Sequence, residues 1–233
     1  MLQLAAAARW GEAWFGRGDA FEVYAGLLAR LSPFGRRADG RLVVRNPLDG
    51  LDATERVPGL AATLCVLLGS TAYDGFSGTA GWTGTLQTSP LGRTPTATLG
   101  LLAVIGVTGA IYALCTAATR VRGAGAAFAH SLVPVALGYL LAHYFTLFTA
   151  EAPRAVALAM GAGPGPVPEP PLEPGALAAL QVCAVVTGHV LGVVAAHDRA
   201  VRLQPPERAV SGQIPLLVLM ITYTLGGLGL LVA

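Results

Sequence analysis

The four histidines of this chain all lie within, or at the edge of, apolar segments, where ionisable side chains are expensive and usually functional. Two of them, His189 and His197, belong to the stretch TGHVLGVVAAHDRA. On a helix, the step of eight residues between them corresponds to about 80° of rotation and roughly 12 Å of rise. The two imidazoles therefore share a broad helix face, but they cannot bind one metal ion side by side.

Imidazole and carboxylate groups can also meet between different spans. If consecutive spans are antiparallel, two sets of histidine and aspartate side chains are expected, one toward each side of the membrane. The first set contains Asp74, His143 and His189, and the second contains His130, His197 and Asp198. Such donors suit zinc or iron, and a bound metal could lower the pKa of a water ligand. The candidate catalytic residues are Asp74, His143 and His189, and the candidate metal ligands are His143, His189, His197 and Asp198.

Each candidate also has a simpler explanation. His197 followed by Asp198 is typical of an interfacial helix end, with a cation near the C-terminus and a carboxylate cap. His189 lies between Gly188 and Gly192, a spacing that lets another helix approach closely, and it could hydrogen-bond across that contact. His143 could belong to the belt of residues at the membrane interface. His130 could lie at the start of a helix, and Asp74 could lie in a turn.

Pro134 predicts a bend in the third apolar span. A proline at this position has no N–H to bond the carbonyl of His130, four residues earlier. His130 and His143 are roughly 140° apart on a straight helix, and such a bend could narrow this angle.

The composition indicates a membrane protein. The 233 residues are 54% hydrophobic and 12% charged, whereas soluble domains carry about 25% charged residues. The formal net charge of +2 and the lack of basic runs interleaved with aromatics exclude a nucleic-acid partner. All 15 basic residues are arginine, which indicates a GC-rich bacterial source. Cys65, Cys115 and Cys183 fall in different apolar segments and imply no disulfide framework.

Five apolar stretches predict an all-α membrane protein, a bundle of about five transmembrane helices in a lipid bilayer. A helix needs roughly 20 residues to cross the hydrocarbon core. The predicted spans are residues 57–73, 99–119, 126–149, 176–197 and 213–233. The first is short, whereas the others are comfortably long enough.

Arginine placement predicts the orientation of these spans. Thirteen arginines fall before the first span, between spans two and three, or after span four, and only Arg93 and Arg154 lie on the other side. By the positive-inside rule, we expect a multi-pass protein of the bacterial plasma membrane with a cytoplasmic N-terminal segment and the C-terminus outside.

Two segments fall outside the spans. Residues 1–56 are expected to form a small cytoplasmic or interfacial segment, with an amphipathic helix in FEVYAGLLARLSPF and then a short hairpin or loop turning at Asp39-Gly40. The Pro- and Gly-rich residues 161–175 are expected to be irregular. The chain starts with MLQLAAAARWGEAWF, which is typical of the middle of a helix, and we expect it to be the C-terminal portion of a longer protein.

Several sequence blocks together resemble a known group. WGEAWFGRGDAFEVYAGLLARLSPFGRR, RNPLDGL, GSTAYDGFS, ALGYLLAHYF, GHVLGVVAAHDRA and QIPLLVLMITYTLGG resemble, in order along the whole chain, actinobacterial polytopic membrane proteins labelled fenitrothion hydrolase. Members of that group are longer, with further spans upstream. The resemblance implies hydrolysis of an organophosphorus ester, but it assigns no catalytic residue.

Two hypotheses follow. In the first, an intramembrane His/Asp site acts as a metal-assisted hydrolase, in which a metal-bound water attacks an ester or phosphotriester. In the second, the chain is a permease or the membrane subunit of a larger complex, with other membrane subunits or an upstream transmembrane half as partners. Its histidines would then relay protons or pack helices. Asp74, His143 and His189 within about 5 Å of one another around a cavity would favour the enzyme. Scattered histidines would favour the second hypothesis.

Overall fold

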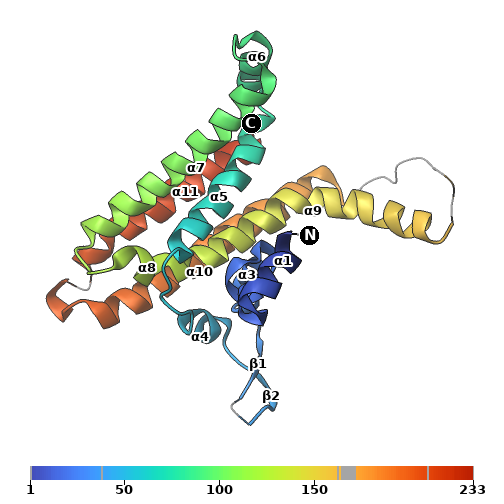
Figure 1. Ribbon diagram of the computed structural model, residues 1–233. Helices are drawn as coiled ribbons and strands as arrows, with labels where there is room; N and C mark the ends of the chain where they lie inside the picture. Colours follow the sequence, from blue (N-terminus) through green and yellow to red (C-terminus); the bar gives the residue numbers. More distant parts are fainter. Residues whose placement is uncertain (1, 38, 162, 164–171, 209, 233) are drawn as a thin grey trace. The chain divides into compact units, whose positions relative to one another are not determined.

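The computed structural model describes residues 2–37, 39–161, 163, 172–208 and 210–232 (Figure 1). Most of the predicted irregular segment 161–175 therefore lies outside the described residues, as does Ala233 at the end of the last predicted span. The described residues are almost entirely helical, with one two-stranded sheet, and the protein is an all-α membrane protein. It consists of two compact units, residues 1–56 and 57–233.

The first unit contains short helices and one hairpin. The helices are α1 (Leu2–Trp10), η1 (Glu12–Trp14), α2 (Phe15–Gly18), α3 (Ala20–Ala29) and α4 (Pro47–Asp52). Asp19 caps α3 by accepting hydrogen bonds from the backbone N–H groups of Phe21 and Glu22. Asn46 caps α4, where Pro47 takes the first helical position, at which no N–H is required.

Strands β1 (Phe34–Arg36) and β2 (Leu42–Val44) pair antiparallel, with Gly35 opposite Val43. Gly40, in the connection between them, has a φ of 81°, which a glycine adopts without steric cost. The Asp39 side chain accepts a hydrogen bond from the backbone N–H of Arg41 and so stabilises the turn.

The second unit is a bundle of helices of very different lengths. The long helices are α5 (Leu60–Ser77), α7 (Arg93–Ala118), α9 (Leu132–Ala159), α10 (Pro174–Leu203) and α11 (Ile214–Val232). Shorter helices connect them: α6 (Ala80–Thr88), α8 (Ala124–Phe128), η2 (Ala129–Ser131), η3 (Pro206–Arg208) and η4 (Ser211–Gln213).

Among the residues that the structure describes, four helical segments are long and apolar enough to cross a membrane. They are Arg93–Ala118, Ala124–Phe145, Gly175–Leu203 and Ser211–Gly229. The first predicted span corresponds to α5, which has 18 residues and is not in this group. Asp74 lies inside α5, three residues before its end, rather than in a turn that follows the helix.

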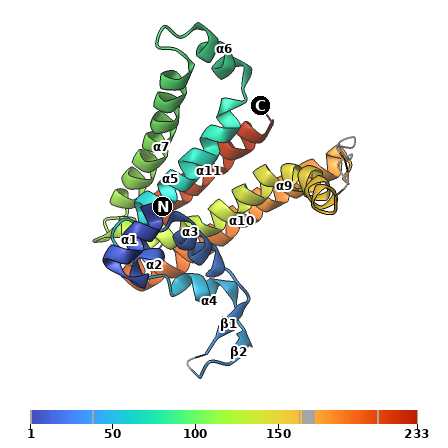
Figure 2. The same ribbon diagram turned by 45° about the vertical axis from the view of Figure 1, so that its right-hand side comes forward.

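The long helices form two groups. Helices α5, α7 and α11 lie together, and α9 packs along α10 (Figures 1 and 2). The groups meet near the starts of α5, α9 and α11 and diverge toward the other end. We call the meeting end the arginine-rich end, because α7 and α10 finish there and five arginines accompany them: Arg120, Arg122, Arg199, Arg202 and Arg208.

The predicted bend at Pro134 was wrong. Helix α9 begins at Leu132, so Pro134 occupies its first turn, where a proline interrupts no intrahelical hydrogen bond. His130 precedes the helix in η2, and its side chain is only 2% exposed. The carbonyl of His130 therefore lies before the start of α9 and not at a kink within it.

Helices α9 and α10 approach each other closely at three glycines. A Cβ atom on Gly188 would lie 2.5 Å from the carbonyl oxygen of Pro134, and one on Gly138 would lie 2.6 Å from that of Ala184. At Gly192 the carbonyl oxygen of Ser131 would be 2.7 Å away. This confirms the prediction that the Gly188 and Gly192 spacing lets another helix approach closely.

Replacing Gly188 by alanine should therefore destabilise the bundle. Gly188→Ala places a methyl group against the Pro134 carbonyl, and overpacking of this kind costs about 1–3 kcal/mol. Gly106→Ala is the matched control, because a Cβ at this position on α7 would meet no atom within 4 Å. Thermal unfolding in detergent micelles should show a lower midpoint for Gly188→Ala, and an unchanged or higher one for Gly106→Ala, since alanine favours helix over glycine. Equal midpoints for the two variants would contradict the close contact.

Candidate functional site

A carboxylate and a phenol join the two helix groups. The Tyr144 hydroxyl on α9 donates a hydrogen bond to Asp74 Oδ2 on α5, with the two oxygens 2.9 Å apart. Asp74 is exposed on the bundle surface, and Tyr144 is 38% exposed. An ionised carboxylate is favoured where water or another polar group reaches it, and Asp74 lies three residues before the end of α5.

His143 lies beside this pair. Its ring and that of Tyr144 are nearly perpendicular, with centroids 4.8 Å apart. The half-buried imidazole lines a small pocket of about 30 Å³ between α5, α9, α10 and α11, together with Thr71, Gly75 and Val185. A pocket of this volume can hold a water molecule. Asp74, Tyr144 and His143 form what we call the Asp74 cluster.

Tyr139 separates this small pocket from a larger one. The larger pocket has a volume of about 190 Å³, and both pockets are lined by Ala72, Tyr139 and Gly227. The Tyr139 hydroxyl donates to the carbonyl oxygen of Tyr223, 3.2 Å away on α11, and occupies the space that a Cβ on Gly227 would fill. Only glycine at position 227 leaves room for this phenol.

Two further tyrosines continue toward the arginine-rich end. The Tyr223 hydroxyl donates to the carbonyl oxygen of Thr108 on α7 at 2.6 Å, and Tyr223 also lines the larger pocket. The Tyr112 hydroxyl donates to the carbonyl oxygen of Gly125 at the same distance, and Tyr112 is 3% exposed. Each buried phenol therefore has a partner on another helix, as expected of tyrosines at membrane depth.

His189 is buried and bonds within its own helix. The ring is 4% exposed, and its Nδ1 lies 2.8 Å from the carbonyl oxygen of Val185. Since a carbonyl only accepts, Nδ1 carries the proton, and Nε2 of the neutral ring is an acceptor. Nε2 has no hydrogen-bond partner within the described part of the chain. The imidazole does not bond across the glycine contact, and it lies edge-on to Tyr139 with ring centroids 6.1 Å apart.

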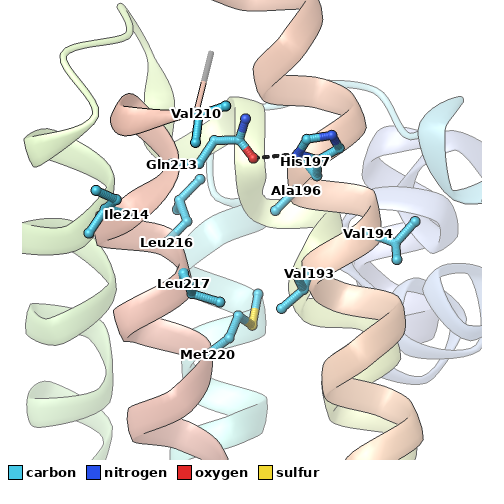
Figure 3. Close-up of a pocket in the computed structure, with 10 residues that line it drawn as sticks. All are labelled: Val193, Val194, Ala196, His197, Val210, Gln213, Ile214, Leu216, Leu217 and Met220. Atoms are coloured by element: carbon cyan, nitrogen blue, oxygen red, sulfur yellow. Dashed lines mark hydrogen bonds between the residues drawn. The ribbon is translucent and has the colours of Figure 1, made fainter. Parts of the chain in front are cut away.

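His197 and Asp198 lie at the arginine-rich end of α10, on its exposed surface. His197 Nδ1 is 2.7 Å from Gln213 Oε1, and both residues line an apolar groove of about 360 Å³ between α10 and α11 (Figure 3). The interpretation of Asp198 as a helix cap was wrong, because α10 continues to Leu203 and Gln204 is its C-cap.

The structure does not gather the candidate residues into one metal centre. Among the described residues, no three His, Cys, Asp or Glu side chains lie close enough together to hold an ion. Asp74 and His143 both contact Tyr144, whereas His189 lies on the neighbouring helix α10. His130 is buried in η2, apart from the exposed His197. The cysteines, all free, lie on α5, α7 and α10.

Sequence reasoning missed the tyrosines and glutamines that complete this region. Tyr144, Tyr139 and Tyr223 link different helices, and Gln181 Nε2 donates to the carbonyl oxygen of Ala142 at 2.8 Å. A signal was present, since a tyrosine or glutamine inside an apolar segment needs a partner for its polar end. The identity of that partner depends on which helices pair.

No protein-family model, curated protein or solved structure matches this chain.

The burial of His189 leads to a test of its structural role. His189→Leu keeps the side-chain volume and removes an acceptor without a described partner, so stability should change by less than about 1 kcal/mol. His189→Ala leaves a cavity and should cost about 2 kcal/mol or more. Thermal unfolding of both variants in the same detergent separates the two effects. An equal loss for leucine and alanine would show that the imidazole nitrogens hold the bundle together.

Proposed function

We propose that this chain is a membrane subunit of a transport system and that the Asp74 cluster is its proton-binding site. The observation that carries the proposal is the hydrogen bond from Tyr144 to Asp74, which joins α9 to α5 across the two helix groups. A carboxyl group reversibly binds a proton, and intramembrane carboxylates commonly serve in proton relays.

The exposure of the Asp74 cluster supports the proposal that this chain is one subunit of a larger assembly. Asp74 and Tyr144 are exposed on helices whose other exposed residues are mostly apolar, such as Val66 and Leu147. A carboxylate facing hydrocarbon would be costly. Water held by a further chain, such as an upstream transmembrane half, would supply the polar environment that Asp74 requires.

The pockets beside Tyr139 support a polar route into the bundle. His143 lines the smaller pocket, and Tyr139 and Tyr223 line the larger one. Both pockets are large enough to hold water, which carries protons between side chains. The phenols of Tyr139 and Tyr223 place polar groups along this route in an otherwise apolar region.

The distribution of the histidines favours transport over a compact catalytic centre. His143 lines the small pocket, but neither Asp74 nor His189 does. A hydrolytic metal site needs several ligands around one open position. The arrangement of separate polar groups along helix contacts matches a relay better than such a centre.

Replacement of Asp74 should abolish proton movement. In membrane vesicles that contain the chain together with its partner subunits, a potassium diffusion potential set with valinomycin should drive proton uptake that a trapped pH-sensitive dye reports. Asp74→Asn should lower the uptake rate by roughly tenfold or more, because the amide cannot take up a proton. Tyr144→Phe should have a smaller effect, since it removes only the donor.

Glu151→Gln is the matched control for this experiment. It makes the same carboxyl-to-amide change on α9, seven residues beyond Tyr144, at an exposed position whose described partner is Arg154. Uptake should stay at the wild-type rate. If the Asp74→Asn and Glu151→Gln variants took up protons at the same rate, the proposed site would be overturned.

Hydrolysis of an organophosphorus ester is a second candidate function. It rests on the resemblance described above and on one structural observation, namely that His143 and Asp74 both contact Tyr144. Imidazole and carboxylate are the usual groups for activating water. A zinc or iron ion, if used by such an enzyme, would take His143 and Asp74 as ligands and fill its other positions with water.

The same variants distinguish the second function from the first. Water addition to a nitrophenyl phosphotriester breaks the bond between phosphorus and the aryl oxygen and releases nitrophenolate, which is followed by its absorbance. His143→Ala and Asp74→Asn should each reduce this rate by about a hundredfold, and Glu151→Gln should not. Full activity in both variants, with no stoichiometric zinc, iron or manganese in purified protein, would exclude the hydrolytic site.

A further inference from the structure

A polar pocket lies at the arginine-rich end, far from the Asp74 cluster. Its volume is about 520 Å³, and two links form it, residues 118–122 at the end of α7 and residues 203–205, 208, 211 and 212 at and beyond the end of α10. The polar side chains that line it come from Thr119, Arg120, Arg122, Gln204, Arg208 and Ser211. No Asp or Glu is among the described residues of its lining.

The three arginines of this pocket bring positive charge without a counter-charge. Across the described chain, the guanidinium groups of Arg120, Arg122 and Arg208 have no ion-pair or hydrogen-bond partner. Guanidinium groups bind phosphate oxygens through paired N–H donors, and several around one pocket favour an anion strongly. The pocket therefore has the charge and the donor chemistry of a phosphate site.

Gln204 adds a second, independent feature. Its side chain is only 9% exposed, and its Nε2 donates to the carbonyl oxygens of Thr119 and Gly212, at 3.4 and 3.5 Å, which ties the two links together. The amide nitrogen is therefore already hydrogen-bonded, whereas Oε1 is a buried acceptor with no partner in the part of the chain that the structure describes. Oε1 lies against Gly212, so the Gln204 side chain fixes the shape of the pocket wall between the two links.

The surface beside the pocket is apolar. The link that carries Gln204 and Arg208 continues through Val210 and Gln213 into the groove between α10 and α11 (Figure 3). Val210 is 78% exposed, and the groove continues past Ile214 and Leu217 to Met220. A phosphate site next to an exposed apolar groove matches a phospholipid better than a soluble phosphate.

We propose that this pocket binds the head group of an anionic phospholipid. Arg120, Arg122 and Arg208 contact the phosphate, and Gln204 holds the two links that carry these arginines together. The acyl chains lie on the apolar surface that begins at Val210. This site is independent of the proton-binding function, because it shares no residue with the Asp74 cluster.

The test measures lipid binding by the whole chain in detergent micelles. The probe is short-chain phosphatidylglycerol, with inorganic phosphate and short-chain phosphatidylcholine as comparisons. Binding is followed by native mass spectrometry and by the rise in the unfolding midpoint. The double variant Arg122→Gln/Arg208→Gln should bind phosphatidylglycerol at least about tenfold more weakly, because two of three charged contacts are lost.

The control is the double variant Arg93→Gln/Arg154→Gln, which removes two arginines at the other end of the bundle. It should bind phosphatidylglycerol as tightly as the wild type. Arg122 and Arg208 are both exposed, so their replacement should leave the unfolding midpoint without lipid unchanged. The site is supported if added salt weakens the binding of phosphatidylglycerol to the wild type, and if phosphatidylcholine does not bind in the same way.

Two results would overturn the proposal. One is equal binding of phosphatidylglycerol by the two double variants. The other is displacement of the lipid by an equal concentration of inorganic phosphate, which would identify a soluble anion as the ligand.

Discussion

The contact between α9 and α10 is the constraint on which the rest of the bundle depends. In a bilayer, helices gain little from hydrophobic burial against each other, so close packing of small residues provides much of their association. Gly138 and Gly188 let the two backbones touch, and this fixes the rotation of α9. With that rotation set, Tyr139 reaches Tyr223 on α11 and Tyr144 reaches Asp74 on α5. A side chain at either glycine would move both phenols away from their partners.

The interactions that hold the helices together differ in strength between the two ends of the bundle. The glycine contact extends over several turns of α9 and α10, whereas the described hydrogen bonds from α9 to α5 and α11 come from Tyr144 and Tyr139. A hydrogen bond between transmembrane helices contributes about 0.6 kcal/mol on average. The end where the groups diverge is therefore the part that can rearrange at the lowest cost. A proton-binding carboxylate at that end is well placed to couple its charge state to helix position.

Much of the fold could be predicted from the sequence, but the site could not. The length and apolarity of the spans predict helices, and the spacing of Gly188 and Gly192 predicts a close contact, because both properties are local. The cap at Asp198 was mispredicted because α10 continues through Arg199 and Arg202, whose long side chains let a helix extend beyond its apolar part. The bond from Tyr144 to Asp74 joins residues 70 positions apart, and no local pattern specifies it.

The distance between the two ends keeps Asp74 apart from the arginines of the pocket. Asp74 lies 14 residues after the start of α5, which is about 21 Å along the helix axis. An ion pair requires contact within about 4 Å, so Asp74 cannot neutralise Arg120, Arg122 or Arg208. The anionic head group proposed for the pocket would supply a counter-charge to these arginines at their own end of the bundle. Among the described residues, Asp74 has no cationic partner and accepts a hydrogen bond from the Tyr144 hydroxyl. The two proposed sites, one for a lipid and one for a proton, therefore lie too far apart to neutralise each other's charge.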